Sequence, residues 1–178
     1  MKTSSEGIAL IKKFEGCRLT SYQDQVGVWT IGYGTTTAAG LGPVTKGQCI
    51  TQEQADEWLI TSLVKYENTV RGGCTVSPSQ NQFDAMVSLC YNIGQNAFLK
   101  SSVLRKHNAK DFKGAAESFV LWNKAGGVVN RGLTRRRIFE EALYARSNVP
   151  ISEPVPTQSA VIVQPARPSL WQRLFRKA

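Results

Sequence analysis

The sequence predicts an α+β fold in which a small N-terminal β lobe and a larger helical lobe are joined by a connecting helix. Three observations lead to this expectation. Glycines and β-forming side chains gather in residues 18–47, helical spacing of apolar residues dominates from residue 51 to 146, and five of the seven prolines follow Asn148. The 178 residues therefore divide into one domain and a proline-rich appendage.

Residues 3–14 are expected to form the first helix. Thr3 and Glu6 have capping-box spacing, and apolar side chains recur along one face behind them. The next segment, residues 18–47, combines closely spaced glycines with the run Val28-Trp29-Thr30-Ile31. That combination is typical of short strands joined by tight turns.

Capping-box spacing between Thr51 and Gln54 then starts the connecting helix, which should run over residues 51–70 and stop at Gly72-Gly73. Ser77 is the expected N-cap of the following helix, with Pro78 in its first turn and Gln80 at its third position. Apolar spacing predicts three more helices. They should cover residues near 101–107, 111–125 (ending at Gly126-Gly127) and 134–146.

Composition limits the function. A hydrophobic content of 42% excludes disorder throughout, and a net charge of +9 favours a polyanionic partner. No helix-turn-helix, zinc-finger or RNP signature supports nucleic acid as that partner. No apolar run approaches the ~20 residues of a membrane span, and the first residues lack a secretory signal, so synthesis in a cytoplasm is expected.

Metal and redox signals are weak. Cys17, Cys49, Cys74 and Cys90 form no CxxC pair, so we expect small buried side chains rather than a zinc site, and no cofactor. The alternative that a disulfide forms after release into an oxidising compartment stays open. The single histidine, His107, is expected at the surface.

The informative stretch lies where the first helix should end. Glu15 follows the apolar Phe14 there, and Asp24 falls in a polar turn at the entrance to the β lobe. Glycosidic cleavage needs two carboxyl groups in unlike environments, one protonated to donate to the leaving oxygen and one ionised. The pair alone is commonplace, but the surrounding sequence makes it specific.

The string Glu-Gly-x-Arg-Leu-x-x-Tyr-x-Asp-x-x-Gly-x-x-Thr-Ile-Gly-x-Gly, residues 15–34, resembles the active-site segment of the phage-type lysozymes, glycoside hydrolase family 24. The resemblance continues through residues 79–85, 91–94, Trp122 and 135–137, and covers roughly residues 3–146. It implies a lysozyme-like fold and an endolysin that hydrolyses the β-1,4 bond between N-acetylmuramic acid and N-acetylglucosamine in peptidoglycan.

By the same resemblance, Glu15 is the general acid, Asp24 is the second catalytic carboxylate and Thr30 places the attacking water, with inversion at the anomeric carbon. Many family members carry His after the Ile-Gly-x-Gly segment, whereas this chain has Thr35, which leaves the three catalytic positions intact.

Substrate contacts are assigned more loosely. Thr36, Tyr91 and Ser101 match cleft-lining positions of the family, although an aromatic at the spacing of Tyr91 also suits a core. Asn92 is a candidate for hydrogen bonding to an N-acetyl group. Three adjacent arginines, 135–137, cannot share one helix face, so at least one should be solvated.

The predicted organisation is a catalytic domain over residues 1–148, a proline-rich linker over 149–168, and a basic amphipathic segment over 169–178. That last segment has the composition of an interfacial membrane binder, so contact with anionic membrane or lipopolysaccharide is one interpretation. Docking on the helical lobe and a disordered end are the others.

We expect a monomer that stays in the host cytoplasm until a holin gives it passage to the periplasm and cell wall. Two rival functions remain at this point: a lytic transglycosylase, and a non-catalytic cationic protein that binds wall or membrane.

Overall fold

The structure is a computed structural model, and it describes residues 1–24 and 26–146. The chain divides into two units, Met1–Asn148 and Val149–Ala178. The predicted linker (149–168) and the predicted amphipathic segment (169–178) lie outside the described residues.

Helices account for most of the described chain. The α-helices are α1 (Ser5–Glu15), α2 (Gln52–Gly73), α3 (Gln80–Ile93), α4 (Gln95–Leu99), α5 (Ser102–Asn108), α6 (Phe112–Glu117) and α7 (Arg131–Ala145). Two 3₁₀ helices are η1 (Thr37–Ala39) and η2 (Phe119–Trp122). The strands are β1 (Arg18–Gln23), β2 (Trp29–Gly32), β3 (Thr35–Thr36), β4 (Lys124–Ala125) and β5 (Val128–Val129).

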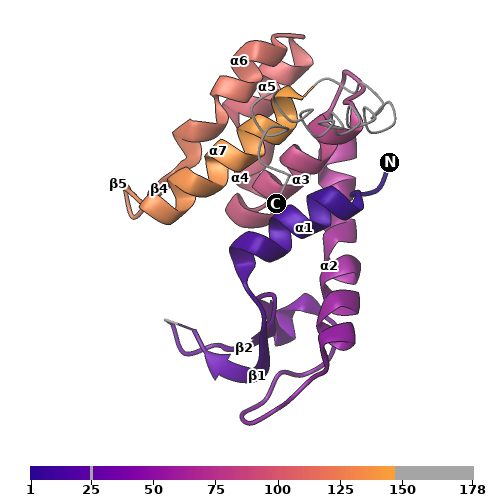
Figure 1. Cartoon of the computed structure of the whole chain (residues 1–178), viewed down its shortest axis with the longest axis vertical. Coiled ribbons are helices and arrows are strands. Elements are labelled where there is room, and N and C mark those ends of the chain that lie inside the picture. Colours follow the sequence, from indigo (N-terminus) through magenta and orange to yellow (C-terminus); the bar gives the residue numbers. More distant parts are fainter. Residues whose placement is uncertain (25, 147–178) are drawn as a thin grey trace, which may run out of the picture. The chain divides into compact units, whose positions relative to one another are not determined.

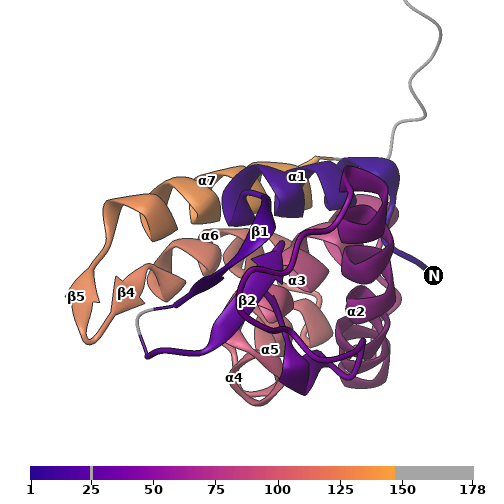
Figure 2. The same ribbon diagram turned by 90° about the horizontal axis from the view of Figure 1, so that it is seen from below.

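The predicted α+β class and its two lobes are confirmed. Strands β1, β2 and β3 form an antiparallel sheet in that order, and they make up the small lobe below the helices in Figure 1. Helix α2 runs from this lobe into the helical lobe, as the predicted connecting helix should. Figure 2 shows the sheet from below, with α1 and α2 adjoining it.

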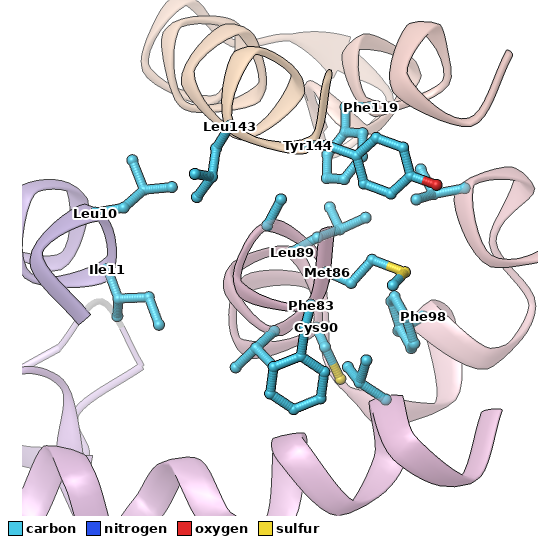
Figure 3. Close-up of a cluster of buried hydrophobic side chains, with 14 of the residues drawn as sticks. Leu10, Ile11, Phe83, Met86, Leu89, Cys90, Phe98, Phe119, Leu143 and Tyr144 are labelled. Atoms are coloured by element: carbon cyan, nitrogen blue, oxygen red, sulfur yellow. The ribbon is translucent and has the colours of Figure 1, made fainter. Parts of the chain in front are cut away.

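Helix α3 forms the centre of the helical lobe. Eight consecutive residues from Phe83 to Cys90 are buried, so this helix has neighbours on all sides. In Figure 3 the side chains of α3 face Leu10 and Ile11 of α1 on one side and Leu143 of α7 on another. A helix that is buried all round fixes the positions of the helices packed on it.

Helix α1 is fixed on α3 at its N-terminal end. The backbone N–H of Ser4 donates to Asp84 Oδ1 at 3.0 Å, and the Ser4 hydroxyl donates to Oδ2 of the same side chain. Gly7 permits this close approach, because a Cβ atom there would lie 2.8 Å from the Cβ of Asp84. The hydroxyl of Thr3 adds a bond to Glu67 Oε1 at 2.8 Å. The far end of α1, where Glu15 lies, is thereby aimed at the β lobe.

The end of strand β2 is tied to three helices around Tyr33. The Tyr33 hydroxyl donates to Asp56 Oδ1 of α2 at 3.1 Å, and Lys12 of α1 forms an ion pair with the same oxygen at 2.8 Å. The Tyr91 hydroxyl of α3 donates to the backbone oxygen of Tyr33 at 2.8 Å. This junction sets the position of the β lobe against the helices that carry the rest of the candidate site.

Several helix boundaries differ from expectation. The N-cap of α1 is Ser4 rather than Thr3, whose side chain is engaged by Glu67. The N-cap of α3 is Ser79, which forms a full capping box with Gln82, so the predicted cap at Ser77 is wrong by two residues. The capping box of Thr51 and Gln54 is confirmed.

The helix expected over residues 111–125 stops at Glu117. A 3₁₀ turn follows, and then a hairpin in which Ala125 pairs with Val128. Gly126 and Gly127 form its two-residue loop with φ of 57° and 82°, as a type I′ turn requires, instead of ending a helix.

Two predictions about burial are corrected. His107 is 0% exposed, not a surface residue, and its ring nitrogens contact the Tyr144 hydroxyl at 2.7 Å and the Val76 carbonyl oxygen at 3.0 Å. Among the cysteines, Cys90 is buried as expected, whereas Cys17 and Cys49 are exposed.

Within the described residues, no helix has both the length and the apolar character that crossing a membrane requires.

Candidate active site

Glu15 is the last residue of α1. The helix ends there because Gly16 adopts φ 68°, a conformation that residues with a Cβ rarely take, while its N–H still donates to the Lys12 carbonyl. The Glu15 side chain is 22% exposed, so one side of it faces solvent and the other faces the protein. Its Oε1 accepts from Nη1 of Arg136 at 2.5 Å.

The carboxyl group of Glu15 thus joins buried charges on α7 and a buried hydroxyl on α3. Arg136 also donates from Nε to Oε1 of Glu140 at 3.0 Å, and the Ser88 hydroxyl donates to that same oxygen at 2.6 Å. The Glu140 side chain is 0% exposed. Desolvation raises the pKa of Glu140, and the neighbouring guanidinium groups of Arg137 and Arg136 act in the opposite direction.

Asp24 lies in a different environment, in the turn that joins β1 to β2. Its side chain is exposed, and its Oδ1 accepts the backbone N–H groups of Val26 at 3.0 Å and Val28 at 2.8 Å. Since both donors contact Oδ1, the second oxygen of Asp24 is left for a ligand.

Thr30 follows on β2 and is 4% exposed. Its hydroxyl donates to the Val28 carbonyl oxygen at 3.1 Å. Val28 therefore connects the two residues, because its N–H holds Asp24 while its carbonyl oxygen orients Thr30. Because the Thr30 hydroxyl donates its hydrogen bond to Val28, the lone pairs of its oxygen remain able to accept a hydrogen bond from a water molecule.

The two carboxyl groups therefore occupy unlike surroundings, as the sequence predicts for glycosidic cleavage. Glu15 is partly buried against an arginine at a helix end, and Asp24 is exposed in a turn with backbone donors. One group is suited to proton donation at a shielded position, and the other to an ionised role beside solvent.

Two predicted substrate-binding residues line one cavity between the β lobe and the helices. Thr36 is the β3 partner of Thr30 in the sheet register, and Tyr91 lies on α3. Both residues border a cavity of about 180 Å³ together with Lys65, Tyr66 and Ser62. Because the Tyr91 hydroxyl already donates to Tyr33, only its ring and lone pairs remain for a ligand.

The other two predicted contacts lie elsewhere. Asn92 is exposed beside a second cavity of about 540 Å³, where its neighbours include Trp122 and Leu133. Its Oδ1 accepts from Arg137 Nη2 at 2.6 Å, which leaves the amide Nδ2 as the free hydrogen-bonding group. Ser101 is 1% exposed and caps α5 by accepting from the Leu104 N–H at 3.1 Å. A buried capping hydroxyl does not reach a glycan, so the binding role expected of Ser101 does not fit this structure.

Sequence reasoning missed the two residues that support Glu15. Arg136 and Glu140 are 3% and 0% exposed, whereas the arginine run suggested only that one member is solvated. That weaker expectation holds for Arg135, which is exposed. The available signal was the i, i+4 spacing of Arg136 and Glu140, which is common on solvated helix faces and did not mark a buried pair.

In residues 1–24 and 26–146, no three His, Cys, Asp or Glu side chains are grouped so as to hold a metal ion.

Comparisons with known proteins identify the family. The phage lysozyme family matches residues 12–140. The endolysin of Acyrthosiphon pisum secondary endosymbiont phage 1 is 40% identical over 148 residues, which cover 81% of this chain and 98% of that protein. The endolysin of Salmonella phage P22 is 42% identical over 144 residues, covering 81% and 98%. A solved structure of P22 lysozyme has a TM-score of 0.76 at 42% identity, covering 82% of this chain and 99% of that one.

Proposed function

The chain belongs to the phage lysozyme family, and we propose that Glu15, Asp24 and Thr30 carry out its reaction. The protein is an endolysin, a glycoside hydrolase of the muramidase type that lyses the host cell wall. The bond that we assign to it is the β-1,4 link from N-acetylmuramic acid to N-acetylglucosamine in peptidoglycan.

In the proposed reaction, Glu15 gives its proton to the glycosidic oxygen as the bond from that oxygen to the anomeric carbon breaks. A water molecule attacks the same carbon from the opposite face, and its proton passes to the carboxylate of Asp24. The Thr30 hydroxyl oxygen accepts a hydrogen bond from this water and holds it in line. The product is inverted, with the α configuration at the new reducing end.

The contrast between the two carboxyl environments is the observation that carries this assignment. Glu15 is shielded on one side and held by Arg136, while Asp24 is exposed and accepts two backbone N–H groups. The shared contact through Val28 supports joint action of Asp24 and Thr30 on one water molecule.

For the glycan we propose contacts on both sides of the junction at Tyr33. Thr36 and the ring of Tyr91 would receive one part of the strand in the smaller cavity. The free Nδ2 of Asn92 would donate to an N-acetyl carbonyl oxygen near the larger cavity. Ser101 is not included, because its side chain is buried.

The decisive experiment compares wild type with Glu15→Gln on purified peptidoglycan, with Glu57→Gln as a control at an exposed carboxylate on α2. Loss of the general acid should lower the rate about 10²–10⁴-fold without unfolding the protein. The control should match wild type. Retention of about a tenth of the wild-type rate by Glu15→Gln would refute the assignment of the acid.

Product analysis separates the alternatives. Hydrolysis adds one water to each cleaved bond, and fresh product should show the α anomer by NMR. An anhydro sugar, with no added water, would identify a lytic transglycosylase. A β product would exclude inversion and imply a covalent intermediate at Asp24. Wall binding without turbidity loss would identify a non-catalytic wall-binding protein.

The surroundings in which the enzyme works belong to the proposal as well. Phage endolysins act on the host cell wall, and we propose that this chain waits in the host cytoplasm as a monomer until a holin lets it reach the wall. For residues 169–178 we propose contact with anionic membrane or lipopolysaccharide, on the basis of their basic amphipathic sequence.

A further inference from the structure

Four buried side chains lie behind the acid and form with it a group that we call the Glu140 cluster: Glu15, Ser88, Arg136, Arg137 and Glu140. Three of them, Arg136, Arg137 and Glu140, are 3%, 0% and 0% exposed. Charged side chains are almost never buried this fully unless they are paired, because removing them from water is costly. The cluster therefore calls for an explanation beyond packing.

Each nitrogen of the Arg136 guanidinium has its own partner. Nη1 donates to Glu15 Oε1 at 2.5 Å, Nε donates to Glu140 Oε1 at 3.0 Å, and Nη2 donates to the Ser88 carbonyl oxygen at 3.2 Å. A guanidinium is planar and presents its donors in a fixed fork. Two contacts on the buried side therefore determine the direction of the third, so Glu140 and Ser88 orient the group that holds Glu15.

Charge balance gives Glu140 a second effect. Arg136 places a positive charge directly beside Glu15, whereas a general acid must hold its proton until the bond breaks. Glu140 places a negative charge on the other side of the same guanidinium and also pairs with Arg137, whose Nε lies 3.1 Å from Glu140 Oε2. The cluster then holds two carboxyl groups and two guanidinium groups, so the attraction of Arg136 is shared between two acids.

Resting on the proposed role of Glu15 as the acid, we propose that Glu140 is a positioning residue for that acid. It fixes the guanidinium of Arg136 and offsets its charge, so that Arg136 orients Glu15 and still leaves it able to carry the proton. Glu140 is 0% exposed and makes no contact with Glu15 itself, so it acts on the acid through the guanidinium of Arg136 that lies between them.

Other titratable groups near the cluster do not supply this balance. Tyr91 on α3 stays neutral, because burial raises the pKa of its hydroxyl. On α1, Lys12 is paired with Asp56. Lys13 lies 3.6 Å from the centroid of the Phe139 ring.

The helices packed on the other side of α7 contribute no buried charge either. On α6, Lys113 and Glu117 are exposed and lie 4.0 Å from each other, and η2 (Phe119–Trp122) contains no ionisable side chain. In residues 1–24 and 26–146, the charged side chain in hydrogen-bond contact with Glu15 is Arg136 of the Glu140 cluster, and Asp24 is an exposed carboxylate that the proposed reaction places across the sugar from Glu15.

The test is the pH dependence of kcat on soluble uncross-linked glycan strands. The upper limb of the profile reports the loss of the proton from the acid. Glu140→Gln keeps the side-chain shape and removes the charge, so this limb should move to lower pH by about one unit, with about a tenfold lower kcat above it. KM should stay unchanged, because Glu140 does not touch the glycan. Glu141→Gln, one residue along α7 and outside the cluster, should leave the profile as in wild type.

Arg137→Met supplies the opposite change. This variant removes a positive charge from the cluster and leaves the negative charge of Glu140 to Arg136 alone. The acid should then hold its proton to higher pH, so the upper limb should move to higher pH. Far-UV circular dichroism and thermal unfolding identify any variant that fails to fold. If one of Glu140→Gln and Arg137→Met does not fold, the pH profile of the other tests the proposal. A purely structural role of Glu140 would lower thermal stability and leave the limb in place, and an unmoved limb in the folded variants would overturn the proposal.

The outcome is separable from that of the proposed function. If Glu15→Gln remains active, the assignment of the acid fails and the role of Glu140 falls with it. If Glu15→Gln is inactive while Glu140→Gln and Glu141→Gln share one pH profile, the acid stands and only the positioning role is wrong.

Discussion

At the scale of single residues, the backbone of Val28 forms hydrogen bonds with both Asp24 and Thr30. Its N–H donates to one oxygen of Asp24, and its carbonyl oxygen accepts a hydrogen bond from the Thr30 hydroxyl. Neither contact needs the side chain of residue 28, so the arrangement depends on the backbone of the turn. These contacts leave one oxygen of Asp24 and the lone pairs of Thr30 unused, as the proposed binding of a water molecule requires.

Asp24→Asn should therefore be severely impaired, with a rate about 10²–10⁴-fold below wild type on purified peptidoglycan. The amide oxygen can still accept from Val26 and Val28, so the turn should persist and circular dichroism should be unchanged. Asp24→Glu should retain part of the activity, since a carboxylate remains near the same water. Equal activity of Asp24→Asn and wild type would show that another group accepts the proton.

His107 should make folding stability depend on pH. Burial lowers the pKa of this imidazole below its ordinary value of about 6.5. Below that pH the unfolded chain binds a proton that the folded chain does not, so the free energy of unfolding falls as the pH drops toward the folded-state pKa. Above it both states are neutral, and the full contribution of His107 is present.

His107→Gln removes this titration. Urea unfolding of both proteins at pH 7.5 and pH 5 should show that the stability advantage of wild type over the variant shrinks at the lower pH. The comparison must be a difference, because Asp84 and Glu140 have raised pKa values and contribute in the opposite direction. An advantage that is constant with pH would mean that His107 does not titrate in this range.

The sequence is informative about single residues only where the partners are close along the chain. Glu15, Asp24 and Thr30 fall within one continuous string, so a linear motif is enough to propose them. Arg136 lies 121 positions from Glu15 along the chain, so no local sequence pattern predicts their contact. His107 shows the same limit. Its burial depends on Tyr144 and Val76, which only the packing of α5 brings to its ring.

At the scale of elements, capping residues determine where helices begin. Ser79 accepts from the Gln82 N–H at 3.2 Å while Gln82 Oε1 accepts from the Ser79 N–H at 2.9 Å. Ser79→Ala should cost about 1 kcal/mol, seen as a drop in Tm of about 2–4 °C. Ser77→Ala is the matched control and should leave Tm unchanged, since Ser77 is exposed and precedes the cap. A larger loss at Ser77 than at Ser79 would contradict the observed capping box.

Element type was predictable wherever apolar spacing was long, as in α2, α3 and α7. Short elements were not. Residues 124–129 form a hairpin whose strands have two residues each, too few to show alternation. The pair Gly126-Gly127 allows either a helix stop or a hairpin turn, and only the pairing of Ala125 with Val128 distinguishes them.

At the scale of the whole molecule, charge is spread over both units of the chain. Residues 149–178 contain four Lys or Arg and one Glu, so of the net charge of +9 this segment holds +3 and residues 1–148 hold +6. Residues 1–148 should therefore supply most of the electrostatic attraction to the anionic wall. Salt screens such attraction to a reach of about 8 Å near physiological ionic strength.

Removal of residues 149–178 tests what that segment adds. The shortened protein should hydrolyse purified peptidoglycan at nearly the wild-type rate and with similar salt sensitivity, because Glu15, Asp24, Thr30 and most of the charge remain. Its binding to anionic liposomes and its killing of intact cells should fall, since Leu170, Trp171, Leu174 and Phe175 supply the apolar spacing of an interfacial segment. Neutral liposomes serve as the control surface. Should truncation instead lower thermal stability and activity on purified wall together, the segment contributes to the catalytic unit and the membrane proposal is wrong.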